Sequence, residues 1–265
     1  MNARTFDHAY TLYGDARNPP LLFIHGIRLG REIWRAHALA LAGEYRVATL
    51  DLPGHGALAE LSFELPLVEA LLAHVIDDVL GRPPIVIGYS LGGYVAMQLA
   101  HDSPERTAGL VLADCTLDLS GWLRHPYDWT MRATSGIPTG ALQRALSLLF
   151  RLTLPREIAR TIIPLPFNRS VFADVSRAGR GVSFSDRLRG YDKPALIVNG
   201  EWDMLFRTDE RTFARAANAR VAVIRHSDHV APLRKPDEFT QLVRAFAAEV
   251  YRGGHGIIAR WTRYR

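Results

Sequence analysis

Ser90 stands between two glycines, Gly88 and Gly92, in the stretch GYSLGG, which follows the apolar run PPIVI and leads into YVAMQLAHD. A serine at a sharp turn from a strand to a helix needs small neighbours, because the turn is strained and tightly packed. The next backbone N–H, that of Leu91, then begins a helix and can stabilise a developing negative charge. The pattern predicts a nucleophilic serine whose hydroxyl is raised above the edge of a sheet.

A serine hydroxyl is a weak nucleophile unless a base removes its proton and an acid orients that base. Two histidines, His226 and His229, follow the apolar run 220–225, where a loop would hang over the same edge of the sheet. We expect His229, in SDHVAP, to be the base, with His226 as the structural alternative nearer the strand. The other histidines after Ser90 are expected on a helix, in an inserted segment and in the tail: His101, His125 and His255.

The acid is expected in a loop at the same edge, because open α/β sheets place their sites at the carboxyl ends of their strands. Asp203, in NGEWD, follows the apolar run 194–199 by a short loop, and we predict that it is the acid. Asp114, at the end of another apolar run, is the main rival. Asp228 precedes the base directly and is expected to hydrogen-bond its own loop.

Short apolar runs alternate with longer amphipathic segments along most of the chain. Continuous apolarity over four to six residues is typical of strands buried on both faces, and the alternation predicts an α/β fold with a mostly parallel, doubly wound sheet. Residues 5–13 are expected to add one or two antiparallel strands. The predicted strands of the main sheet are 20–25, 46–51, 84–89, 108–114, 194–199 and 220–225. The predicted helices between them are 31–42, 66–80, 91–103, 208–217 and 236–250.

The alternation is interrupted once, between residues 116 and 190. A structureless loop of this length is unlike a compact domain, so short helix-like pieces at 139–151, 155–163 and 168–178 predict an inserted helical cap. We therefore assign 1–115 and 191–251 to the α/β core, 116–190 to the cap, and 252–265 to a basic C-terminal tail.

The net charge of +5 is concentrated in two segments. The predicted cap has eleven arginines and five acidic residues, and the tail has four arginines and no acid. This distribution lacks the continuous basic stripe of a nucleic-acid-binding protein. We expect no nucleic-acid partner and, since no apolar run is long enough to span a bilayer and no secretory signal is visible, no membrane partner. The single cysteine, Cys115, is expected to be buried and apolar, which is compatible with a cytoplasmic location.

Five short motifs, in this order and spacing, resemble the α/β-hydrolase superfamily over most of residues 18–251. They are FIHGI (23–27), DLPGHG (51–56), GYSLGG (88–93), NGEWD (199–203) and SDHVAP (227–232). The resemblance implies that the N–H groups of Ile27 and Leu91 form an oxyanion hole. It implies that His25 and Gly26 shape the first loop, and that Asp51 and His55 stabilise a turn.

A serine at the elbow resembles the esterase and lactonase branch of this superfamily, since dehalogenases and epoxide hydrolases carry aspartate there. The resemblance implies hydrolysis of a small-molecule ester or lactone through an acyl-enzyme, with no cofactor and no metal. The alternative is a non-hydrolytic use of the fold, as a lyase that employs the triad as a base or as a small-molecule receptor. The oligomeric state is left open.

Two sets of cap side chains could contribute to specificity. Most of the cap arginines are expected to be solvated, but one or two could bind an anionic substrate. More than half of the cap aromatics are expected in the cap core, and the others could line an apolar pocket. The arginines are Arg124, Arg132, Arg144, Arg151, Arg156, Arg160, Arg169, Arg177, Arg180, Arg187 and Arg189. The aromatics are Trp122, Tyr127, Trp129, Phe150 and Phe167.

Overall fold

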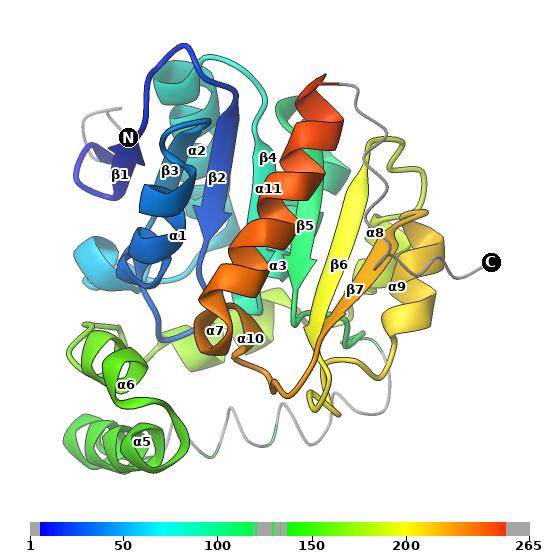
Figure 1. Ribbon diagram of the computed structural model, residues 1–265. Helices are drawn as coiled ribbons and strands as arrows, with labels where there is room; N and C mark the ends of the chain where they lie inside the picture. Colours follow the sequence, from blue (N-terminus) through cyan, green and yellow to red (C-terminus); the bar gives the residue numbers. More distant parts are fainter. Residues whose placement is uncertain (1–5, 119, 121–128, 130–132, 134–136, 253–265) are drawn as a thin grey trace.

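The computed structural model describes residues 6–118, 120, 129, 133 and 137–252. Its centre is a seven-stranded sheet in the order β1-β3-β2-β4-β5-β6-β7, in which only the pairing of β1 with β3 is antiparallel (Figure 1). The strands are β1 (Tyr10–Tyr13), β2 (Pro20–Ile24), β3 (Arg46–Leu50), β4 (Ile85–Tyr89), β5 (Gly109–Ala113), β6 (Ala195–Gly200) and β7 (Arg220–Ile224). The predicted α/β class and mostly parallel sheet are confirmed, and the segment 5–13 supplies one strand.

The apolar runs form strands because both faces of the sheet are covered. Every residue of β2, β4, β5 and β6 is buried, which matches their uninterrupted apolar sequences. The register pairs Ile24 with Gly88 and Tyr89 with Ala113. The parallel strands thus end close together, and the loops that follow β2, β4, β6 and β7 lie at one edge.

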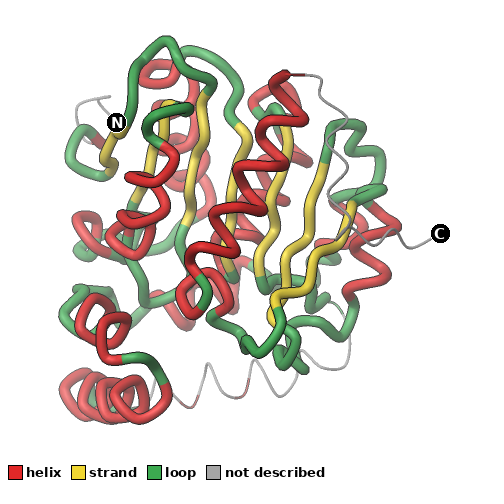
Figure 2. Tube along the Cα trace, in the orientation of Figure 1, coloured by secondary structure: helices red, strands yellow, loops and turns green. Residues whose placement is uncertain are grey.

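Helices cover the two faces of the sheet (Figures 1 and 2). On one face, α1 and α11 pack through a buried cluster that includes Trp34, Phe239 and Phe246. On the other face, α2, α3 and α9 pack through a second cluster. The helices of these two layers are α1 (Arg35–Leu41), α2 (Leu65–Ala73), α3 (Leu91–Asp102), α9 (Glu210–Ala216), α10 (Ala231–Arg234) and α11 (Pro236–Arg252).

Short helical turns complete the core. A π-helical segment extends α2, so the helix predicted over 66–80 changes its winding partway along. The segments are the 3-10 helices Arg31–Trp34, Gly56–Leu58 and Pro104–Arg106 and the π-helix His74–Leu80.

Four helices lie between β5 and β6 in the part of the chain that the structure describes, in the region predicted to be a cap. Figure 1 shows α5 and α6 beyond the carboxyl edge of the sheet. The helices are α5 (Thr139–Thr153), α6 (Arg156–Ile162), α7 (Val171–Ala178) and α8 (Phe184–Arg187). Several residues singled out in the sequence lie outside the described residues. They are Trp122, Arg124, Tyr127 and Arg132 of the predicted cap and residues 253–265 of the predicted tail.

In the part of the chain that the structure describes, no helix combines the length and the apolar character needed to cross a membrane.

Candidate active site

The turn at Ser90 joins the end of β4 to the first residue of α3. Ser90 has φ +50° and ψ −116°, a conformation that costs energy for a residue with a side chain. A Cβ on Gly88 would collide with the carbonyl of Gly92, and a Cβ on Gly92 would collide with the carbonyl of Ile24. The two glycines are therefore required by contacts between backbones, which no side-chain movement could relieve.

The structure brings the three predicted side chains together. Ser90 Oγ lies 3.1 Å from His229 Nε2, and His229 Nδ1 lies 2.7 Å from Asp203 Oδ2. Ser90 and Asp203 are buried, whereas the His229 side chain is about one-third exposed. An ionised carboxylate accepts hydrogen bonds only, so Nδ1 carries the proton and Nε2 can accept one from the serine.

Two aromatic residues hold the imidazole in this position. The hydroxyl of Tyr89, the residue before the serine, donates a 2.8 Å hydrogen bond to the carbonyl of His229. The ring of Phe206 stacks on the imidazole with 4.0 Å between ring centroids, and the Phe206 N–H donates to Asp203 Oδ1 at 3.2 Å. The sequence reasoning gave no role to either residue, because Tyr89 fills a variable position of GYSLGG and Phe206 lies outside the five motifs.

The rival acids serve other partners. Asp114 is fully buried and accepts the N–H of Gly200 at 2.8 Å and that of Ala231 at 3.3 Å, which joins the two loops that carry Asp203 and His229. Burial raises the pKa of Asp114 well above its ordinary value. It thus supports the loops without touching the imidazole.

Asp228 has a further partner that ties the cap to the histidine loop. Its carboxylate accepts a 3.3 Å hydrogen bond from Val230 N–H, as predicted, and pairs with Arg234 at 2.8 Å. The same guanidinium donates a 3.3 Å hydrogen bond to the carbonyl of Thr153 at the end of α5. The rival base His226 is largely exposed, with its N–H donating to Glu201.

The loop after β2 is shaped by buried, neutral histidines. His25 Nε2 accepts the N–H of Leu52 at 3.0 Å, so Nδ1 carries the proton and donates to the carbonyl of Gly26 at 2.8 Å. Burial lowers the pKa of His25 to about 4. Burial, aided by His25, lowers the pKa of His55 to about 3.

Asp51 accepts the N–H groups of Arg31 and Ala57 and also pairs with the Arg31 side chain.

Two backbone N–H groups belong to residues that line a pocket together with Ser90. Leu91 is the first residue of α3, so its N–H has no acceptor within the helix. Among the described residues, neither the Ile27 nor the Leu91 N–H has a hydrogen-bond acceptor. Both residues line one pocket with Ser90. Their N–H groups are thus available to a ligand, as the oxyanion prediction requires.

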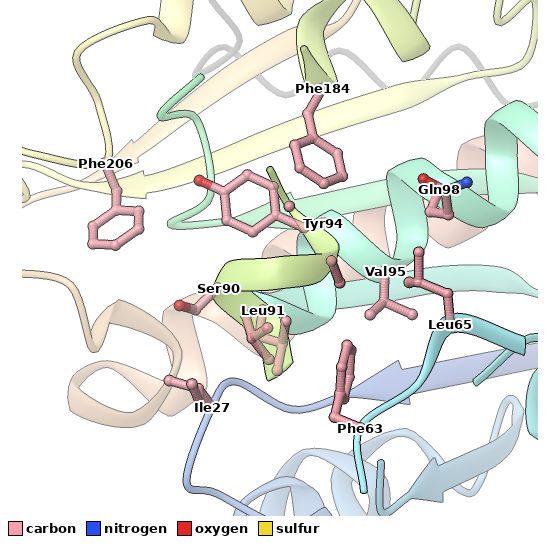
Figure 3. A pocket seen from close by; sticks show the side chains of 13 residues that line it. Ile27, Phe63, Leu65, Ser90, Leu91, Tyr94, Val95, Gln98, Phe184 and Phe206 are labelled. Carbon is pink, nitrogen blue, oxygen red and sulfur yellow. The ribbon is translucent and has the colours of Figure 1, made fainter. Parts of the chain in front are cut away.

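A pocket extends from Ser90. Figure 3 shows Ser90 and Ile27 on one side of it and Gln98 on the other. Its aromatic lining consists of Phe63, Tyr94, Phe184 and Phe206, of which only Phe184 comes from the predicted cap. The remaining lining is mostly aliphatic: Leu65, Leu91, Val95, Val175, Ala178 and Gly179. The pocket suits an apolar group next to the serine.

The described members of the predicted cap arginines and aromatics lie outside this pocket. Phe150 and Phe167 do not line this pocket, and Trp129 is 73% exposed. None of the described cap arginines lines it either. The sequence suggested these residues from composition, which carries no information about the direction of a side chain. Phe150 and Phe167 instead enclose Arg28, which follows Ile27 and was not singled out in the sequence.

A mostly parallel sheet of this order, with a serine elbow after β4 and inserted helices after β5, defines an α/β-hydrolase fold. Residues 21–242 match the sequence model described as the alpha/beta hydrolase family. The chain belongs to this family, and the predicted resemblance is confirmed.

Several relatives are esterases. The pimeloyl-(acyl-carrier protein) methyl ester esterase of Nitrosospira multiformis is 26% identical over 250 residues, which cover 86% of this chain and 94% of that protein. The enzyme of the same name from Aeromonas salmonicida is 29% identical, with 87% of this chain and 96% of that protein covered. A hydrolase structure from Pseudomonas aeruginosa has a TM-score of 0.76 and 25% identity, over 90% of this chain and 93% of that chain.

Proposed function

We propose that the chain is a serine hydrolase that cleaves carboxylic esters or lactones of small molecules. The observation that carries the proposal is the continuous path from Ser90 Oγ through His229 to Asp203, at 3.1 and 2.7 Å. The N–H groups of Ile27 and Leu91, which have no acceptor among the described residues, support the same function, as do relatives whose names are those of esterases.

In this mechanism, His229 Nε2 takes the proton as Ser90 Oγ attacks the ester carbonyl. The N–H groups of Ile27 and Leu91 stabilise the oxyanion, and a single donor of this type contributes about 3 kcal/mol to transition-state stabilisation. His229 then protonates the leaving alkoxide. A water activated by His229 hydrolyses the acyl-enzyme, while Asp203 holds the imidazole in the required tautomer.

The pocket indicates what kind of group lies next to the scissile bond. It is lined mainly by aliphatic and aromatic side chains, with Gln98 as a polar residue at the end opposite the serine. An apolar lining is typical of sites that bury most of a small ligand. An unbranched or lightly branched acyl or alcohol group of modest length is the substrate portion that fits.

The test compares initial rates on 4-nitrophenyl acetate, butyrate, octanoate and decanoate for the wild type and Ser90→Ala. Ser227→Ala is a matched control, because the buried Ser227 hydroxyl lies in the histidine loop but has no hydrogen-bond partner among the described residues. We expect loss of turnover in Ser90→Ala and near wild-type rates in Ser227→Ala.

The acyl chain length that gives the highest kcat/KM then indicates the length of acyl group that the pocket accommodates. Equal turnover by the wild type and Ser90→Ala would overturn the proposal. Folded wild-type protein that hydrolyses neither these esters nor a panel of lactones would instead point to a lyase or receptor role for the same site.

A further inference from the structure

Arg28 is a buried cation without a hydrogen-bond partner. The residue is only 4% exposed, and Nε and both terminal nitrogens are buried with no acceptor among the described residues. The guanidinium carbon lies 4.6 Å from the ring centroid of Phe167 and 4.9 Å from that of Phe150. The two rings provide cation–π contacts, but they cannot accept the five N–H groups in the guanidinium plane.

Among the residues that the structure describes, no salt bridge compensates the charge of Arg28. Burial lowers the pKa of Arg28 to about 10, and no carboxylate contributes to the shift. Asp51 is occupied by Arg31. Removing a charge from water without a counter-ion is costly, so buried cations are ordinarily paired. Arg28 also has φ +64°, a backbone conformation that residues other than glycine rarely adopt. Backbone and side chain are thus both held in an unfavourable state.

The position of Arg28 connects it to the candidate active site. A Cβ on Gly26 would lie 3.2 Å from Ser90 Cβ, so the segment that leads to Arg28 passes directly beside the serine. Ile27 lines the apolar pocket, whereas Arg28 does not. The guanidinium therefore lies outside the apolar pocket, one residue beyond the predicted oxyanion donor.

The cap side of Arg28 lies near the histidine loop. Phe150, whose ring contacts the Arg28 guanidinium, belongs to α5. Three residues further along α5, the carbonyl of Thr153 is bonded to Arg234. Figure 1 shows α5 and α6 beyond the carboxyl edge of the sheet, where the loop after β2 begins.

We propose that Arg28 is an anion-binding residue of the substrate site, and that the substrate is an ester or lactone bearing a carboxylate. The apolar pocket would take the uncharged side of the scissile bond, and the Arg28 guanidinium would take the carboxylate on the other side through paired N–H···O bonds. Entry of the carboxylate requires the Phe150 or Phe167 ring to move aside, which exchanges a cation–π contact for an ion pair. This inference rests on the proposed esterase function.

The experiment measures kcat/KM on two matched pairs of esters at pH 7.5. One pair carries the charge on the acyl side: 4-nitrophenyl hydrogen adipate and its methyl ester. The other carries it on the alcohol side: 4-butanoyloxybenzoate and its methyl ester. We expect the wild type to prefer the anionic member of one pair. In Arg28→Met, the ratio of anionic to neutral kcat/KM for that pair should fall about 10- to 100-fold.

Two further variants separate a specific contact from general charge. Arg151→Met removes a cation from an exposed position of α5 and should leave the ratio within about threefold of the wild-type value. Arg28→Lys keeps the charge but loses the paired geometry, so it should recover part of the preference. Arg28→Met should fold, because it replaces an unpaired buried charge with an apolar chain.

The outcomes distinguish this inference from the function on which it rests. Ser90-dependent hydrolysis with no anionic preference in either pair, or a preference unchanged in Arg28→Met, would overturn the role of Arg28 and leave the esterase function intact. No hydrolysis of any ester or lactone by the wild type would overturn both. If Arg28→Met fails to fold, Arg28→Lys decides: an anionic preference equal to that of the wild type would overturn the paired contact with Arg28.

Discussion

Asp203→Asn tests whether the carboxylate of Asp203 works through His229. The amide has nearly the same shape, but it carries no charge and can present an N–H to the imidazole. Since Asp203 Oδ2 lies 2.7 Å from His229 Nδ1, the amide would favour the tautomer with the proton on Nε2. That tautomer cannot accept the proton of Ser90. The variant should therefore fold and bind substrate, but lose the proton transfer.

The size of the loss follows from the geometry. The carboxylate and the imidazolium formed during the reaction would have charge centres about 4 Å apart, worth about 4 kcal/mol at an effective dielectric constant of 20. At about 1.4 kcal/mol per factor of ten, kcat should fall about 10³-fold. The wrong tautomer adds to this loss, so about 10³- to 10⁴-fold is expected.

The assay is kcat on 4-nitrophenyl butyrate, with thermal unfolding to verify folding. Asp228→Asn is the matched control, because the Asp228 carboxylate is next to the base in the chain but pairs with Arg234 and not with the imidazole. In this variant kcat should fall less than tenfold. The decisive comparison is with Asp114→Asn. If that variant loses activity while Asp203→Asn keeps more than a tenth of it, the assignment of the acid is wrong.

Two further predictions concern stability. Gly88→Ala forces a methyl group into the Gly92 carbonyl and should lower the free energy of unfolding by about 2 kcal/mol in a urea titration; Gly43→Ala, which meets open space, should change it by less than about 1 kcal/mol. Burial holds the pKa values of His25 and His55 at about 4 and about 3, so the unfolded chain, titrating near 6.5, binds more protons in between. The contribution of the two neutral histidines to the free energy of unfolding should be present above about pH 6.5 and lower by about 2 kcal/mol per histidine at pH 5. An unfolding midpoint that rises on acidification would contradict this.

The strands and the serine turn were predictable because their requirements are local. A strand buried on both faces needs an apolar run, and a backbone collision at Gly88 or Gly92 admits only glycine, so both leave a clear trace in the sequence. His229 and Asp203 were predictable for a related reason. Parallel strands bring their ends to one edge, so the position after a strand already places a side chain near the serine.

The pocket and Arg28 could not be predicted in the same way. Phe63, Tyr94 and Phe206 come from three separate segments, and only the packing of these segments turns their rings toward one cavity. Arg28 looks like an ordinary surface cation in a chain rich in arginine. Its burial depends on Phe150, more than a hundred residues away, so no local pattern reveals it.

The guanidinium of Arg234 couples the inserted helices to the histidine loop, so a change in one of them affects the other. It bonds the last turn of α5 through the Thr153 carbonyl and the residue before the base through Asp228. One residue inserted into α5 moves that carbonyl by about 1.5 Å along the helix and turns it by about 100°, enough to break the bond. A chimaera that takes its cap from a relative therefore needs a residue 234 that is compatible with that cap. Mutant libraries that vary the length of α5 should vary residue 234 as well.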